Sequence, residues 1–216
     1  MRLTAPRTCA RSQTDLDSIP KAAFTAFWLA RPPACTILSI MLKALAFAGL
    51  LLVSGPDFGP SDKMFEDLLA APTEEEANDI ALDIWAAWME SGSDAADLVM
   101  ERAVNAQAMG DLDLAQALYD RVLAIQPGYA EAWNRRATVF LAKENYAEAL
   151  RDVNEALRLE PRHFGAWGGL GSVMESLGST DEALAAYEKA LEIYPRFQSA
   201  KRGVARIKRE KQGRPV

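Results

Sequence analysis

The sequence has few of the residues on which enzymes and metal sites depend. It holds two cysteines, Cys9 and Cys35, and one histidine, His163, in 216 residues. A zinc site or a cysteine nucleophile therefore has no cysteine available after position 35, and a lone histidine cannot complete a Ser/His/Asp triad. The HExxH, CxxC, GxSxG and GKS/T patterns are also missing. We expect a protein that is not an enzyme and binds no cofactor or metal.

Basic residues are scarce between residues 56 and 197, where 11 Lys and Arg stand against 27 Asp and Glu. This excess of acid argues against nucleic acid as a partner. The acidic residues either form solvated outer faces or create a field that attracts a basic partner. The tail, residues 198–216, is the opposite, with seven basic residues against one acidic residue.

Residues 1–55 show no pattern of a folded domain. Residues 1–40 have no sustained period, and we interpret them as disordered or as an extension upstream of a true start at Met41. Residues 41–55 place Lys43 before an apolar run and small residues, which is typical of a signal peptide, although an uncleaved membrane anchor fits as well. The segment predicts an exported protein, periplasmic or tethered to the inner membrane; the alternative is a cytoplasmic one.

The rest of the chain is organised by a sequence repeat whose successive copies end at Pro127, Pro161 and Pro195. Moving along the chain by the spacing between these prolines keeps the same order of residue types, which is large apolar, small, large apolar, small and aromatic. The small residues let two helices approach closely, and the large ones fill the space beside them. The third copy shows the pattern most fully, with Trp167, Leu170, Gly171, Met174, Ala183 and Tyr187.

This pattern resembles the tetratricopeptide repeat, with copies at 96–129, 130–163 and 164–197. The resemblance implies an all-α fold: a right-handed superhelix of about three helix pairs, with capping helices at both ends. Residues 61–95 are interpreted as an N-terminal capping pair, because an apolar stripe recurs at helical spacing from Ala77 to Trp88. The tail, 198–216, is interpreted as a basic capping helix. Parts of the sequence are also similar to small exported repeat proteins of Gram-negative bacteria whose function is unassigned.

The family pattern assigns structural roles to six residues: Trp133, Arg136, Asp152, Trp167, Gly171 and Tyr187. Arg136 stands where the family usually has a buried leucine, and members with this arginine often carry an aspartate sixteen residues later. The resemblance therefore implies an ion pair between Arg136 and Asp152. His163 opens a helix, and we interpret it as a capping or packing residue. Gly165, Gly168 and Gly169 lie on a helix, where they permit either close helix contact or the approach of a ligand backbone.

In this family the first helix of each pair lines a concave groove in which peptides often bind. The positions that point into it by resemblance are Met100, Val104, Gln107, Glu131, Asn134, Thr138, Leu141, Gly168, Ser172 and Glu175, together with Asp97. They are acidic, polar and small, so the groove suits a basic or neutral segment. We expect a noncatalytic scaffold that binds a protein or peptide; the alternative is a structural envelope protein whose repeats mediate self-association.

Overall fold

The computed structural model describes residues 59–213, and all regular secondary structure in that range is helical. The helices are α2 (Asp62–Ala70), α3 (Glu74–Trp88), α4 (Asp94–Ala108), α5 (Leu112–Ile125), α6 (Ala130–Ala142), α7 (Tyr146–Leu159), α8 (Phe164–Ser176), α9 (Thr180–Ile193) and α10 (Gln198–Gly213). The predicted all-α class is confirmed for this part of the chain. None of these helices is both long and apolar enough to cross a membrane. The predictions for residues 1–40 and 41–55 lie outside the described residues.

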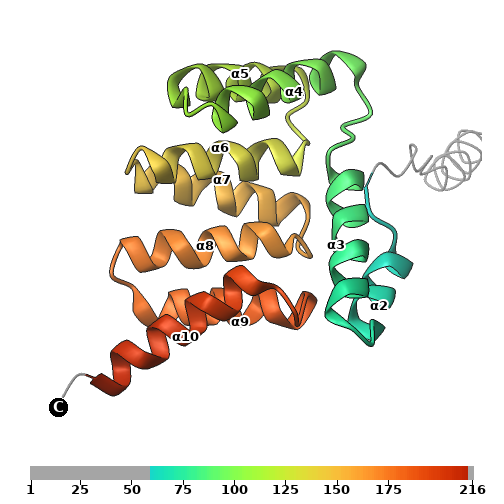
Figure 1. The fold of residues 1–216 in the computed structure, drawn as a ribbon. Helices are drawn as coiled ribbons and strands as arrows, with labels where there is room; N and C mark the ends of the chain where they lie inside the picture. Colours follow the sequence, from blue (N-terminus) through green and yellow to red (C-terminus); the bar gives the residue numbers. More distant parts are fainter. Residues whose placement is uncertain (1–58, 214–216) are drawn as a thin grey trace, which may run out of the picture. The chain divides into compact units, whose positions relative to one another are not determined.

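Helices α4 to α9 form three pairs that follow one another in a stack (Figure 1). Each pair corresponds to one of the three predicted repeats, except that α4 begins at Asp94, two residues before the predicted bound of the first repeat. Gly171 and Tyr187 show how closely the helices of a pair approach. A Cβ atom at position 171 would lie 2.5 Å from Cε1 of Tyr187, so only glycine lets α8 and α9 pack with this tyrosine between them. The structural roles expected of both residues are confirmed.

Successive pairs contact one another through two recurring positions on the first helix of each pair. The buried residues at these positions are Ala132 and Val139 on α6, Ala166 and Val173 on α8, and Ala200 and Ile207 on α10. Because the repeat interval continues unchanged into the tail, α10 stands where the first helix of a fourth pair would be. Its Ile207 packs with Ala183, Tyr187 and Ala190 of α9, so the tail helix covers the last pair.

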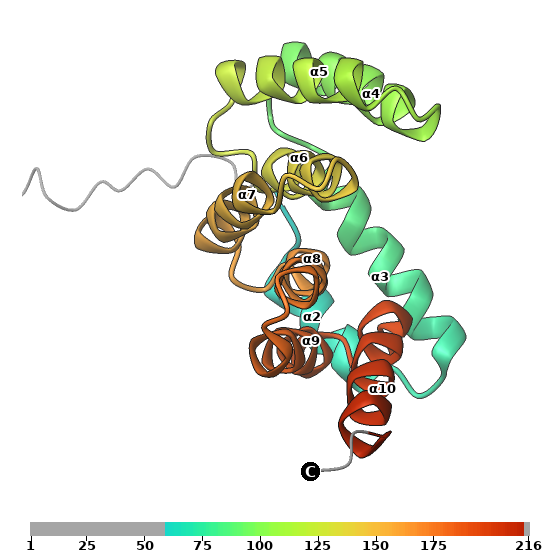
Figure 2. The same cartoon turned by 90° about the vertical axis from the view of Figure 1, so that its left-hand side faces the viewer.

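The helices α2 and α3 do not lie where the sequence analysis expected them. Instead of covering the free end of the first pair, α3 runs across the turns that lead into α6, α8 and α10 (Figures 1 and 2). Its buried residues Ile84 and Trp88 pack with Phe164 and Tyr194. The prediction that residues 61–95 cap the end of the stack is wrong, because the apolar stripe of α3 matches these aromatic turns.

Aromatic residues hold α3 in this position at each of the turns it crosses. The hydroxyl of Tyr129 donates to the carbonyl of Met89 at 2.6 Å, and the hydroxyl of Tyr194 donates to Asn78. Arg196 reaches the carbonyl oxygens of Ala71 and Pro72, which join α2 to α3. The helix is therefore tied along its length to three successive turns of the stack.

The free end of the first pair is left open by this arrangement. Leu98 and Asn105 on α4 are at the positions equivalent to the buried alanine and the buried β-branched residue of α6, α8 and α10. Both residues are exposed, and Leu98 is 53% exposed. A polar asparagine replaces the buried valine, which suits a surface that meets water. Within the described residues, the first pair thus ends the stack without a separate cap.

Candidate partner-binding groove

The predicted groove residues divide into two groups according to their place along each helix. Those nearer the helix starts are buried, namely Met100, Glu131, Asn134 and Gly168, with the exception of Asp97 at the start of α4, which is partly exposed. Those nearer the helix ends are partly exposed, namely Val104, Gln107, Thr138, Leu141, Ser172 and Glu175. On α6 and α8 the division follows the position of α3, which lies beside the starts of these two helices (Figure 1). Only the far part of the predicted groove is therefore open to a partner.

Glu131 lies at the centre of a buried polar cluster. One carboxylate oxygen accepts from Nε2 of His163 and Nδ2 of Asn134, both at 2.9 Å, and the other accepts from Nε of Arg135 at 2.5 Å. The side chains of Glu131 and His163 are 0% exposed. The prediction that Glu131 lines the groove as an exposed acid is wrong, because the carboxylate is enclosed and fully paired.

The predicted capping and packing role of His163 is confirmed. The neighbouring groups also determine which tautomer the imidazole adopts. Its Nδ1 accepts from the backbone N–H of Ala166 at 3.1 Å and so caps α8. The hydrogen then sits on Nε2, which donates to Glu131. The imidazole also stacks on Trp88, with ring centres 3.9 Å apart and planes 7° from parallel. One histidine therefore joins α3, α6 and α8.

The pKa of Glu131 reflects a competition between burial and pairing. Burial alone raises the pKa of this carboxyl, but the hydrogen bond from His163, together with the charge and hydrogen bond of Arg135, lowers it more. The net pKa lies below the ordinary value, so the carboxylate is charged at neutral pH. The cluster is consequently a neutralised structural unit, since each oxygen has a donor.

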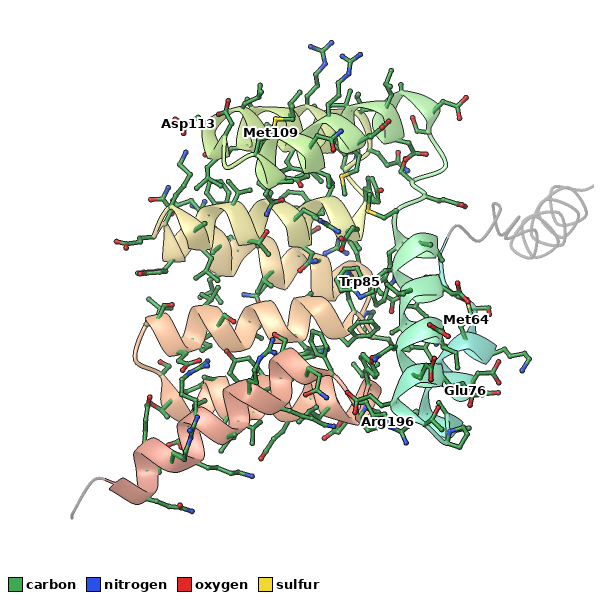
Figure 3. All side chains as sticks on the ribbon, in the orientation of Figure 1. Met64, Glu76, Trp85, Met109, Asp113 and Arg196 are labelled. Carbon is green, nitrogen blue, oxygen red and sulfur yellow. The ribbon has the colours of Figure 1, made fainter. Side chains whose placement is uncertain are left out.

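Trp85 fills the space above the start of α8 (Figure 3). A Cβ atom at position 165 would lie 2.4 Å from Cη2 of Trp85, so Gly165 is needed for this indole to pack there. At Gly168 a Cβ atom would meet the ring of Phe197 at 3.0 Å. The sequence left two interpretations open for these glycines, close packing or the approach of a ligand backbone. The structure supports close packing at both, against aromatic rings.

The second acidic residue predicted for the groove is also paired. Both oxygens of Glu175 accept from Arg206 of α10, and one of them also accepts from the hydroxyl of Tyr187. The hydrogen bond from Arg206 lowers the pKa of Glu175. The expectation of an acidic groove is therefore wrong at both glutamates, because Glu131 is enclosed and paired with His163 and Arg135, and Glu175 is paired with Arg206 of α10.

Two polar groove residues are occupied by contacts between α4, α5 and α6. The side-chain amide of Gln107 donates to Oγ1 of Thr138 at 2.8 Å and accepts from the hydroxyl of Tyr119 at 2.7 Å. Thr138 in turn donates to the carbonyl of Arg135. These groups hold the first and second pairs together, so less hydrogen-bonding capacity remains for a partner than the sequence suggested.

The outer side of α6 carries the ion pair implied by the family pattern. Nε and Nη2 of Arg136 donate to the two oxygens of Asp152 at 2.6 and 2.9 Å, which confirms the prediction. Nη1 donates to Asp120 of the preceding pair at 2.7 Å, and the guanidinium lies 4.7 Å from the ring centre of Trp133. Arg136 thus connects two repeats as well as two helices.

Trp133 and Trp167 make the same contact in successive repeats. The indole N–H of Trp133 donates to the carbonyl of Pro127, and that of Trp167 donates to the carbonyl of Pro161. Both rings are partly buried rather than fully enclosed. Each tryptophan therefore fixes the proline turn that precedes its own helix, which explains why the two residue types recur together.

The described residues offer little for chemistry at a reaction centre. No group of three or more His, Cys, Asp or Glu side chains in this range is placed to hold a metal ion. The residues that sequence reasoning missed are those of α3, above all Trp85 and Trp88. A usable signal was present in Tyr129, His163 and Phe197, which occupy equivalent positions in successive repeats and all meet the α3 region.

These features define a class: a stack of successive helix pairs in which the first helices of neighbouring pairs contact one another through recurring buried positions. The family model described as tetratricopeptide repeat matches residues 100–158 and 135–196. The matched range includes most of all three predicted copies. Residues 100–196 of the chain therefore match the tetratricopeptide repeat family.

A TPR repeat-containing protein of Rhizobium etli is 35% identical over 113 residues, which cover 52% of this chain and 55% of the relative. The chain thus spans about half the length of this curated relative. The Arabidopsis OM64 TPR domain aligns with a TM-score of 0.53 at 23% identity, over 54% of this chain and 96% of its own. The Sgt2 TPR domain of Aspergillus fumigatus gives 0.54 at 24% identity, over 57% and 87%. These two structures are similar in fold.

A third solved structure was determined with a ligand. The first TPR of Spaghetti (RPAP3), bound to the HSP90 peptide SRMEEVD, has a TM-score of 0.53 at 23% identity, over 55% of this chain and 94% of its own. At this identity the likeness again concerns the fold.

Proposed function

We propose that this chain is a noncatalytic scaffold whose concave groove binds a segment of another protein. The observation that carries the proposal is the partly exposed row on the first helices, which includes Val104, Leu141 and Ser172. On α8 this row ends at Glu175, which is paired with Arg206 of α10, so α10 borders the row at that end. A bordered groove with apolar and polar lining suits an extended or helical segment. The peptide complex of the RPAP3 repeat domain supports a groove of this kind by likeness of fold.

A photo-crosslinking experiment tests where the partner binds. A crosslinking amino acid at Val104 or Ser172 should capture the partner in the native host. Asn154 of α7 and Ala185 of α9 are exposed positions on the second helices and serve as matched controls. Capture from the groove positions alone supports the proposal. Equal capture from both sets would contradict it.

A groove-filling variant then measures affinity for the captured partner. Asn134 is unsuitable because it is buried and bonded to Glu131, so Val104→Trp is the better change, with Ala185→Trp as the control. We expect a dissociation constant in the range of roughly 1 μM, which is about −8 kcal/mol. Val104→Trp should weaken it at least about tenfold through steric exclusion, a loss of about 1.4 kcal/mol. An unchanged affinity would place the partner elsewhere.

Self-association is a second candidate, favoured by the open end of the first pair. Leu98 is 53% exposed there, and Met109 in the α4–α5 turn is 84% exposed (Figure 3). Exposed apolar side chains at the end of a stack favour contact with a second copy. Sedimentation over a wide concentration range should show a monomer if the scaffold role alone holds. A dimer that Leu98→Glu dissociates would favour the assembly role.

Export remains part of the proposal and concerns residues 41–55, which lie outside the described residues. Expressed from Met41 with a C-terminal tag, the protein should fractionate with the periplasm or the envelope. Replacing Leu51 and Leu52 by arginine should retain it in the cytoplasm, because charge in the apolar run opposes insertion. Equal cytoplasmic recovery of the two forms would contradict export.

A further inference from the structure

The space between α3 and α10 forms a depression of ≈ 360 Å³, which we call the α3–α10 notch. It is lined by Asn78, Ala81, Leu82, Trp85, Tyr194, Phe197, Gln198, Ser199 and Arg202. The α3 residues in this set recur at helical spacing, so they form one face of that helix. Leu82 is 64% exposed although it stands beside the rings of this depression. The notch therefore presents apolar surface that the described residues leave uncovered.

Among the described residues that line the notch, Arg202 is the one that carries a charge. On α10 it lies one helical turn before Arg206, which is paired with Glu175 at the open part of the groove. Within residues 59–213, Arg202 itself forms no ion pair with Asp or Glu. Glu74 of α3 accepts from the side-chain amide of Gln198, another residue of the notch. A cation at the edge of an apolar depression thus remains available.

We propose that the α3–α10 notch anchors a partner segment in which a large apolar side chain is followed or preceded by an acidic residue. The apolar side chain fills the space between Leu82, Trp85 and Phe197, and the carboxylate pairs with Arg202. This inference rests on the proposed function, because α10 borders the same concave groove. It differs in location, since the notch lies between α3 and α10, which are outside the three repeats, and the end of the third repeat at Tyr194 and Phe197.

The geometry favours a protein segment over a membrane surface. The notch is recessed between two helices and contains one cation, whereas a flat anionic surface is best met by several protruding cations. Such cations exist on other parts of α10, including Lys208 and Arg209, which are exposed. A recess of this size accepts a side chain, and an apolar side chain in it would bury surface from both helices.

A peptide library displayed on phage, selected against the full chain, tests the proposed partner chemistry. Selection should enrich peptides with a large apolar residue next to Asp or Glu. The enriched peptides should bind Leu82→Glu at least about tenfold more weakly, because removing a buried apolar contact typically has an effect of this size. Arg202→Glu should reverse the preference and enrich Lys or Arg beside the apolar residue.

Matched controls keep the result specific to the notch. Leu69→Glu changes an exposed leucine on α2 (54% exposed, against 64% for Leu82), and Arg209→Glu makes the same charge change about two turns further along α10; neither residue lines the notch. Both should bind the enriched peptides as the parent does. Circular dichroism should be unchanged in all four variants, because each side chain is exposed.

The outcomes separate this inference from the proposed function. Peptides that lose binding in Val104→Trp but not in the two notch variants would support the groove and overturn the notch. Peptides that no variant weakens, or a selection that enriches nothing, would count against both. Binding of the parent to vesicles containing an anionic lipid, lost in Arg202→Glu without any peptide preference, would replace the protein partner by a membrane and overturn the inference.

Discussion

Helix α6 carries two clusters of charged residues, one facing α3 and one facing α5 and α7. In the inner cluster Glu131 is paired with His163 and Arg135, and its side chain is 0% exposed. In the outer cluster Arg136 is paired with Asp152 and with Asp120, whose side chain is 50% exposed. The inner cluster joins the repeats to α3, whereas the outer one joins repeats to each other. Paired carboxylates thus hold the repeats to α3 in a buried cluster and hold successive repeats together in a partly exposed one.

The largest effect should follow from removing the centre of the inner cluster. Glu131→Ala leaves Arg135 and His163 without their carboxylate partner inside the protein. Breaking a buried ion pair by deleting one partner destabilises a protein by about 3–5 kcal/mol. Equilibrium denaturation in urea measures the loss. Glu148→Ala, on the partly exposed outer side of α7, is the control and should change stability by less than about 0.5 kcal/mol. Equal losses would contradict the proposed importance of the inner cluster.

Acid should weaken the inner cluster through the same carboxylate. Because the folded-state pKa of Glu131 is lowered, its stabilising contribution is complete above the ordinary pKa of about 4.3 and is lost as the pH falls through the folded-state value. Stability should therefore decline below about pH 4.3. Glu131→Gln should show a shallower decline than the parent, since Glu175 and other lowered carboxyls remain in both proteins. Identical acid profiles would show that Glu131 does not titrate in this range.

The contrast between the clusters also shows what the sequence can predict. The outer pair belongs to the repeat itself, so the constant repeat interval and the family pattern were enough to predict Arg136 and Asp152 as partners. The positions of the three helix pairs followed from the same periodicity. Such features depend on residues that recur at fixed separations within contiguous segments.

The inner cluster was not predictable in this way. Its arrangement depends on α3, which is outside the repeats and meets α8 through residues far apart in the chain, such as Trp88 and His163. The stripe of α3 indicated an amphipathic helix but not the surface it covers. Glu131 therefore looked like a groove acid, and only the placement of Trp85 and Trp88 shows that it is buried. Gly165 had two open interpretations for the same reason, because the sequence does not show that Trp85 of α3 packs against it.

The outer cluster should tolerate the loss of one acid better than the inner cluster. Asp152→Ala removes two hydrogen bonds from Arg136, but Asp120 still accepts from the same guanidinium. Loss of a charged hydrogen-bond partner of this kind costs about 1–3 kcal/mol, so the melting temperature should fall by several degrees. Thermal unfolding followed by circular dichroism measures it. No change in melting temperature would show that the pair adds nothing to stability.

The smallest effect should come from replacing the outer pair by what the third repeat already uses. Leu170 and Ala186 stand one repeat after Arg136 and Asp152, and Leu170 packs in the core beside Trp167. The double variant Arg136→Leu, Asp152→Ala therefore copies a native combination. Replacing a buried ion pair by apolar residues that fit is often neutral or stabilising, because the desolvation of both charges is avoided. Asp120 then loses its partner but is half exposed, so water can solvate it.

We therefore expect the double variant to lie within about 1 kcal/mol of the parent and to be more stable than Asp152→Ala alone. The matched single change, Arg136→Leu, leaves Asp152 buried without its cation and should be the least stable of the three. Thermal and urea unfolding of all four proteins complete the cycle. A double variant that is as unstable as either single variant would show that the outer pair contributes net stability, and the contrast with the inner cluster would then be one of degree.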